Sequence, residues 1–106
     1  MTAFLVQYRR AAIEDITQIH EYLNSEASLE LADRFVMAVE HTVQQVSDFP
    51  YAGALVPGRS IRILSMRRWP VKAFPRYYIY YTADDQRVII VRIIHSARDT
   101  SRQTGL

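Results

Sequence analysis

The spacing of apolar residues changes from a strand-like to a helical period near the start of the chain. Residues 3–8 alternate between apolar and polar positions, which predicts a short first strand. From Ala11 the period becomes helical, and this helix is expected to end at Asn24-Ser25. Ser28 suits the N-cap of a second helix, which Pro50 must terminate. The two apolar stripes comprise Ile13, Ile16, Ile19 and Leu23, then Ala32, Phe35, Val36, Val39, Val43 and Val46.

The second half of the chain reads as strands. Residues 61–66, 74–82 and 87–95 are rich in β-branched and aromatic residues, and Asp84-Asp85-Gln86 predicts a tight hairpin turn between the last two. Residues 49–59 are expected to be loop, and residues 67–73 to be a basic, aromatic connection. The order β-α-α-β-β-β predicts an α+β fold in one domain, residues 1–106: an antiparallel sheet with an N-terminal helical hairpin packed on it. Residues 100–106 are expected to form a flexible tail.

Charge divides the chain into two unequal halves. Residues 1–58 carry three basic and eight acidic residues, whereas residues 59–106 carry ten basic and three acidic ones. Either the halves meet different partners, or two faces of one domain pair internally.

No apolar run approaches the roughly 20 residues of a membrane helix, and no basic leader precedes the first apolar run, so neither a membrane span nor a secretory signal is expected. The absence of cysteine excludes disulfides and suits a reducing cytoplasm.

The stretch from Arg87 to Asp99 is the most distinctive in the chain. An almost wholly apolar strand, expected to be the central one, runs into His95, Arg98 and Asp99. Polar groups at a strand end are often functional, because the sheet holds them still at the surface. The three histidines, His20, His41 and His95, lack metal-ligand spacing, so no metal and no other cofactor is expected.

These elements together resemble the RelE/ParE superfamily of bacterial toxin–antitoxin toxins over nearly the whole chain. The residues that carry the resemblance are Ala12, Asp15-Ile16, Ile19 and Tyr22-Leu23 in the first helix, Ala32, Phe35, Pro50 and Gly53 in and after the second, Arg62 with Leu64, Tyr78-Ile79-Tyr80-Tyr81, and Val91 to Asp99. The closing His-x-x-Arg-Asp pattern is similar to the ParE (plasmid stabilisation) branch. One departure is Arg9-Arg10, where many relatives have a Ser or Thr that caps the first helix.

The resemblance implies a cytoplasmic toxin that a ParD-like antitoxin neutralises in a toxin–antitoxin hetero-oligomer. ParE-type members inhibit DNA gyrase by binding it, and this is the function we expect. The alternative is a RelE-like, ribosome-dependent mRNA endoribonuclease, which would act without metal. A third interpretation is a member that binds its antitoxin without being toxic.

No catalytic residue is assigned from the sequence. The ribonuclease alternative needs a base, an acid and cationic clamps around one phosphate, for which Arg62, Arg76, Tyr81 and His95 are the candidates. Strict alternation puts Arg92 and His95 on opposite strand faces, which predicts that they do not meet one phosphate. His95 is either an acid–base group or a hydrogen-bonded structural residue, and Arg92 either pairs with a carboxylate or contacts a partner.

A basic, aromatic cluster is the main candidate for partner binding. It comprises Arg67, Arg68, Trp69 and Lys72, to which we add Arg98. Cations beside a large aromatic suit nucleic acid or a protein interface, and the plainer interpretation is a Trp that covers the core edge. We expect the antitoxin to present an acidic, amphipathic segment to this Arg-rich half.

Overall fold

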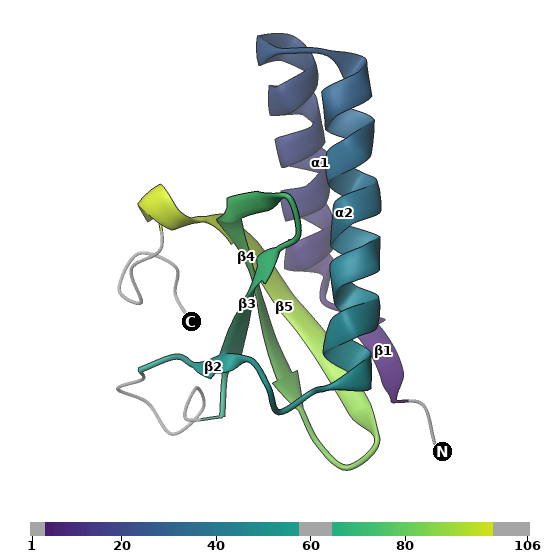
Figure 1. The fold of residues 1–106 in the computed structure, drawn as a ribbon, viewed down its shortest axis with the longest axis vertical. Coiled ribbons are helices and arrows are strands. Elements are labelled where there is room, and N and C mark those ends of the chain that lie inside the picture. The colour runs from purple at the N-terminus through teal and green to yellow at the C-terminus, as the bar shows by residue number, and fades with distance from the viewer. Residues whose placement is uncertain (1–3, 58–64, 99–106) are drawn as a thin grey trace.

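A helical hairpin packs on one face of a five-stranded sheet in the computed structural model, which describes residues 4–57 and 65–98 (Figure 1). The elements are β1 (Leu5–Tyr8), α1 (Arg10–Glu26), α2 (Leu29–Asp48), β2 (Ala54–Leu55), β3 (Arg67–Val71), β4 (Phe74–Ala83), β5 (Arg87–His95) and a 3₁₀ helix (Ser96–Arg98). The strand order across the sheet is β1-β5-β4-β3-β2. The predicted α+β fold is therefore confirmed.

The sheet is mostly antiparallel, with one exception at its edge. β2, β3, β4 and β5 pair antiparallel in sequence order, whereas β1 lies parallel to β5. The parallel pairing follows from connectivity, because the helical hairpin carries the chain back over the sheet after β1. β5 is an interior strand, and β4 is the middle one.

Both helices begin close to their predicted starts. Ser28 caps α2 as predicted, since its hydroxyl accepts a hydrogen bond from the Leu31 N–H at 3.0 Å. α1 begins at Arg10 without a side-chain cap, which agrees with the Arg9-Arg10 departure noted in the sequence. α1 runs to Glu26, past its predicted end at Asn24-Ser25.

The prediction that residues 67–73 form a connection is wrong, because Arg67–Val71 is strand β3. Trp69 and Val71 pack toward the helices and give this basic segment the alternation of a half-buried strand. Pro70 is tolerated because β2 pairs only with Arg67 and Arg68, so no β2 residue lies beside it. The predicted strand at residues 61–66 lies mainly outside the described residues, and Ser65 and Met66 precede β3 as turn and coil.

A very tight turn joins β3 to β4 and is anchored to α2. Ala73 has a φ of 70°, in the left-handed region that non-glycine residues rarely adopt. The Lys72 N–H donates to the Thr42 hydroxyl at 3.0 Å, and that hydroxyl donates to the Ala38 carbonyl at 2.7 Å. Thr42 is fully buried, so a buried side chain of α2 holds this turn in place.

The sheet has two unlike faces. The helix face, which α1 and α2 cover, carries the main core from Phe35 and Val39 of α2 to Ile79 and Ile93 of the sheet. The second face carries a smaller cluster of Val56, Met66, Tyr80 and Ile94. The alternation slips once, because Tyr81 lies opposite Ile90 and Tyr80 lies opposite Arg92, which leaves Val91 as the extra residue of a β-bulge.

Candidate functional site

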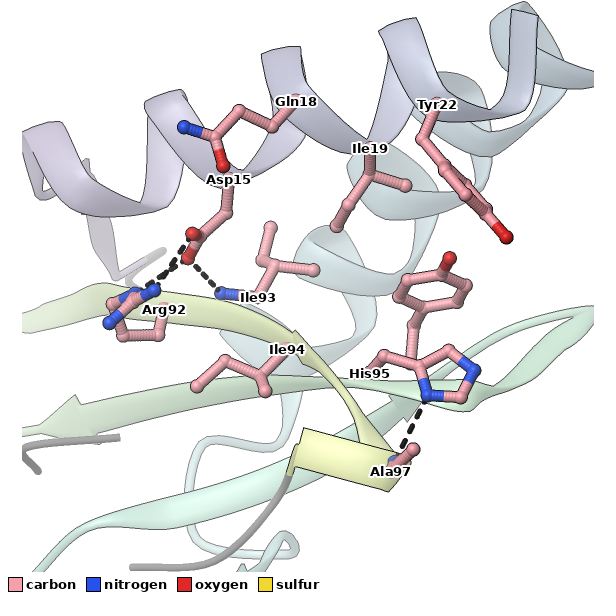
Figure 2. Close-up of a pocket in the computed structure, with 10 residues that line it drawn as sticks. Asp15, Gln18, Ile19, Tyr22, Arg92, Ile93, Ile94, His95 and Ala97 are labelled. Atoms are coloured by element: carbon pink, nitrogen blue, oxygen red, sulfur yellow. Dashed lines mark hydrogen bonds and ion pairs between the residues drawn. The ribbon is translucent and has the colours of Figure 1, made fainter. Parts of the chain in front are cut away.

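A groove of about 770 Å³ lies between α1 and the end of β5 (Figure 2). α1 forms one wall with every third or fourth side chain, and the last residues of β5 form the other. Its lining residues are Asp15, Gln18, Ile19, Tyr22, Tyr77, Arg92, Ile93, Ile94, His95 and Ala97. The groove therefore joins the strand end singled out from the sequence to a face of α1 that was not selected as part of a site.

A carboxylate from α1 fixes the middle of β5. The Arg92 guanidinium donates two hydrogen bonds to Asp15, from Nε at 2.7 Å and from an Nη at 2.9 Å, and the Ile93 N–H donates a third at 2.9 Å (Figure 2). The Asp15 side chain is 12% exposed and that of Arg92 is 31% exposed. The hydrogen bonds that Arg92 donates to Asp15 raise the pKa of Arg92, against the opposing effect of burial. Of the two interpretations of Arg92, the structure thus shows the carboxylate pair.

Asp15 was not among the residues that sequence reasoning selected for the site. Its position off the apolar stripe of α1 is typical of a solvated carboxylate, and its partner lies 77 residues away. The one available signal was Arg92 itself, since a cation in an apolar strand needs a counter-charge.

His95 is held by its neighbours on both sides. Its Nδ1 accepts a hydrogen bond from the Ala97 N–H at 3.0 Å, so in the neutral ring the proton is on Nε2. Its ring meets Tyr77 edge-on at 4.9 Å between centroids, and Tyr77 meets Phe35 of the core at 5.0 Å. His95 is thus hydrogen-bonded, as the structural interpretation requires, yet it still lines the groove.

The predicted placement of Arg92 and His95 on opposite faces of β5 is confirmed, although both side chains line one groove. The two positions do belong to opposite faces, since Arg92 lies opposite Tyr80 of the second face and His95 lies opposite Tyr77 of the helix face. Both side chains nevertheless line one groove, because Arg92 passes over the edge of β5 to reach Asp15. Strict alternation missed both this exposed edge and the bulge at Val91.

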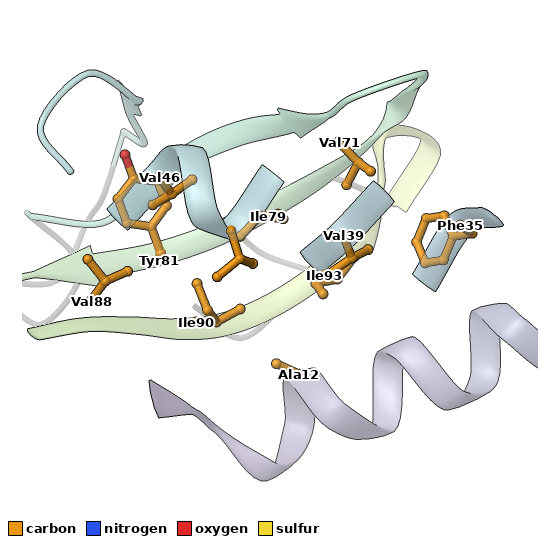
Figure 3. Close-up of a cluster of buried hydrophobic side chains, with 11 residues drawn as sticks. Ala12, Phe35, Val39, Val46, Val71, Ile79, Tyr81, Val88, Ile90 and Ile93 are labelled. Carbon is orange, nitrogen blue, oxygen red and sulfur yellow. The ribbon is translucent and has the colours of Figure 1, made fainter. Parts of the chain in front are cut away.

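Of the three ribonuclease candidates that the structure describes, Tyr81 lies apart from His95. Tyr81 is fully buried in the main core (Figure 3), where its hydroxyl accepts the Gly53 N–H at 3.1 Å, and burial raises the pKa of that hydroxyl. It lies four residues along β4 from Tyr77, which is opposite His95, so about 13 Å separate the two ends of this ladder. Arg76 is exposed on β4, and Arg62 lies outside the described residues.

The predicted basic cluster is divided between the two faces of the sheet. Arg67 and Trp69 point to the helix face, where an Arg67 Nη donates to the Gly53 carbonyl at 2.7 Å and Trp69 packs on the core. Arg68 points to the second face, with its guanidinium 4.6 Å from the Tyr78 ring centroid. Lys72 is exposed in the turn after β3. Arg98 ends the 3₁₀ helix, and Asp99 lies beyond the described residues.

Two classes of site are not found in the part of the chain that the structure describes. Residues 4–57 and 65–98 hold no group of three or more His, Asp or Glu side chains able to bind a metal ion. None of the helices in those residues has the length and apolar character that crossing a membrane requires.

The helical hairpin, the sheet order and the His-ended last strand define the RelE/ParE-like toxin fold. The family described as "ParE toxin of type II toxin-antitoxin system, parDE" matches residues 6–100, and the chain belongs to this family. It is thus a ParE-family toxin of a type II toxin–antitoxin system. No curated protein sequence matches the chain.

Solved structures show the same fold at low sequence identity. The chromosomal ParDE toxin–antitoxin system from P. aeruginosa is 16% identical, with a TM-score of 0.72 over 88% of this chain and 96% of that one. The E. coli DinJ-YafQ toxin–antitoxin complex is 11% identical, with a TM-score of 0.63 over 90% and 94%. The hypothetical protein HP0894 from Helicobacter pylori is 16% identical, with a TM-score of 0.55 over 89% and 96%.

Proposed function

We propose that this toxin inhibits DNA gyrase by binding to it and that a ParD-like antitoxin neutralises it. Membership of the ParE family supports gyrase as the target. Binding rather than chemistry is supported by the separation of two ribonuclease candidates, since Tyr81 is buried about 13 Å along the ladder from His95. An acid and a base that serve one phosphate must both come within hydrogen-bond reach of it. Gyrase lies in the cytoplasm, which is where we expect the toxin to act.

Three cations are our candidates for contacting gyrase. Lys72 is exposed in the β3–β4 turn and Arg68 is half-buried on the second face, and Arg98 of the 3₁₀ helix is added from the sequence. Arg67 and Trp69 contribute less in this proposal, because one bonds the Gly53 carbonyl and the other packs on the core. Surface cations of this kind steer association and set its salt dependence.

A supercoiling assay with purified gyrase tests the proposal. We expect the toxin to inhibit supercoiling and equimolar antitoxin to restore it. The variant Lys72→Glu should weaken inhibition several-fold. The variant Arg34→Glu, which likewise reverses the charge of an exposed cation but on α2, should leave inhibition unchanged. Undisturbed supercoiling at concentrations that arrest growth would overturn the gyrase proposal.

One observation favours the ribonuclease alternative. The Ala97 N–H donates a hydrogen bond to Nδ1 of His95, which lines the groove. Nε2 is therefore the ring nitrogen through which His95 would exchange a proton with a substrate. Primer extension on translated mRNA tests this alternative, which predicts codon-specific cuts that His95→Gln abolishes. Such cuts with untouched supercoiling would replace the first proposal by the second.

A further inference from the structure

The two edge strands of the sheet differ in how well they are protected. β2 forms one edge and is only two residues long. β1 forms the other edge over Leu5–Tyr8, and within residues 4–57 and 65–98 no strand lies on its outer side (Figure 1). Proteins protect exposed edges with charged residues, proline, β-bulges or very short strands. Residues 4–8 read Phe-Leu-Val-Gln-Tyr and pair with β5 without a register shift, so β1 carries no charge, proline or bulge.

The backbone groups on this outer edge belong to two residues. The Leu5 N–H donates to the Gln86 carbonyl at 2.8 Å, which shows that Leu5 faces β5. Alternate residues of a paired strand face the same neighbour, so Gln7 also faces β5, whereas Val6 and Tyr8 face outward. The edge therefore offers two N–H donors and two carbonyl acceptors, which are placed symmetrically about Gln7.

The side chains next to this edge provide apolar surface on both faces of the sheet. Val6 and Tyr8 pack against the main core on the helix face, and Leu5, on the opposite face, is 64% exposed. A hollow of about 230 Å³ lies beside Tyr8 and contains one charged residue, and Ile13 in its lining is 53% exposed. Its lining residues are Tyr8, Ile13, Ile16, Val36, Val39 and Glu40. A chain that pairs with β1 can thus bury apolar surface as well as bond the backbone.

The cations that follow β1 favour one orientation for a second copy of this chain. Parallel pairing in register would place Arg9 of the second copy beside Arg9 of the first. In an antiparallel pair centred on Gln7, Arg9 lies opposite Leu5 of the second copy, and the two Arg9 residues are about 13 Å apart along the ladder. This distance exceeds the Debye length of about 8 Å at physiological ionic strength, so their repulsion is largely screened. A twofold, antiparallel contact is therefore compatible with the charges at this edge.

We propose that two copies of this chain associate through β1 and join their sheets into one continuous sheet. Val6 of each copy exchanges two hydrogen bonds with Tyr8 of the other, which uses every outward-facing group of the strand. Val6 opposite Tyr8 is a favourable pair of a β-branched and an aromatic residue. The two Gln7 residues face each other at the axis, where each amide can donate to the other. A four-residue strand contact is small beside the roughly 800 Å² per partner of a stable complex, so the dimer is weak and forms at micromolar concentrations.

Single-cysteine cross-linking of the purified toxin tests this register, because the chain has no cysteine of its own. Opposed residues of the non-hydrogen-bonded type have Cα atoms about 4.5 Å apart, which is within the range of a disulfide. Gln7→Cys should therefore form a covalent dimer under mild oxidation. Leu5→Cys is the matched control on the same exposed face of β1, and its two copies would lie about 13 Å apart. We expect it to cross-link at least about tenfold less.

Amide hydrogen exchange at two toxin concentrations tests the pairing without cross-linking. The Val6 and Tyr8 amides should exchange at least about threefold more slowly at about 1 mM than at about 10 μM, while the Gln7 amide, which faces β5, should not change. Gln7→Lys places like charges opposite each other and should remove this dependence on concentration. Gln18→Lys, the same change at an exposed position of α1, should retain it.

Three results would overturn the inference. The first is equal cross-linking of the two cysteine variants, and the second is exchange at Val6 and Tyr8 that does not change with concentration. The third is protection of these two amides by the antitoxin in a toxin that stays monomeric alone, because the antitoxin would then be the chain that pairs with β1.

Discussion

Removal of the Asp15 carboxylate should destabilise the whole fold, although Asp15 lies on a helix surface. Asp15→Ala deletes three hydrogen bonds at once, two to the Arg92 guanidinium and one to the Ile93 N–H. An unpaired buried N–H costs about 1–3 kcal/mol, and a charge-assisted bond is worth about 1.5–3 kcal/mol. Arg92 is 31% exposed and can recover part of its hydration, so we expect a total loss of about 2–4 kcal/mol.

Chemical denaturation of purified variants measures this loss. Asp15→Asn keeps one acceptor and should lose about half as much free energy of unfolding as Asp15→Ala. Asp33→Ala is the matched control, because Asp33 also bonds a basic side chain, His20 at 2.8 Å, but is 62% exposed, and its loss should stay below about 1 kcal/mol. If Asp15→Ala unfolded at the same denaturant concentration as Asp33→Ala, the hydrogen bonds of Asp15 to Arg92 and Ile93 would not stabilise β5 in the way described.

Three further predictions concern the helix cap and the contact between Gly53 and Tyr81. Ser28→Ala should lower the free energy of unfolding by about 1 kcal/mol through loss of the α2 N-cap, as denaturation will measure. Gly53→Ala should cost more, about 1–3 kcal/mol in the same experiment, because the new Cβ would lie 2.9 Å from Cζ of the buried Tyr81 ring and closer still to its hydroxyl. The raised pKa of Tyr81 means that its contribution to stability is complete below the ordinary value of 10.0 and is lost as the pH rises above it. Absorbance titration should accordingly show late-ionising tyrosines that include Tyr81 and Tyr8, whose pKa burial also raises, and Tyr81→Phe should reduce the late step by one tyrosine.

Much of the fold follows from local patterns in the sequence. The helical stripes, the Ser28 cap and the hairpin between β4 and β5 depend on residues a few positions apart. The cap and the hairpin are confirmed, and so are the stripes except for Ile13, which is exposed. β3 was missed because Pro70 and two cations obscure its alternation. Pairing with β4 stabilises this segment as a strand although its local propensity is low. The turn after β3 was missed because Ala73 adopts a left-handed conformation that usually signals glycine or asparagine.

The site was less predictable than the fold. His95 and Arg92 stood out in the sequence, but the groove that joins them depends on Asp15 and Tyr22 of a distant helix. The bulge at Val91 also shifts the face of every later residue in β5, and nothing in the run of Ile and Val marks its position. Charge clustering along the chain was misleading for Arg67 and Arg68, because neighbours on a strand point to opposite faces.

The pairing of β1 with β5 has a consequence for synthesis of the toxin. β1 leaves the ribosome first, yet its one neighbour in the described sheet is the last strand to be made. Such a high sequence separation slows folding, because a long loop must close before the contact can form. The nascent chain therefore cannot form the β1–β5 pairing, or the ion pair between Asp15 and Arg92, until residue 92 has emerged. A truncation anywhere before β5 therefore leaves β1 without the strand that it pairs with in the described sheet.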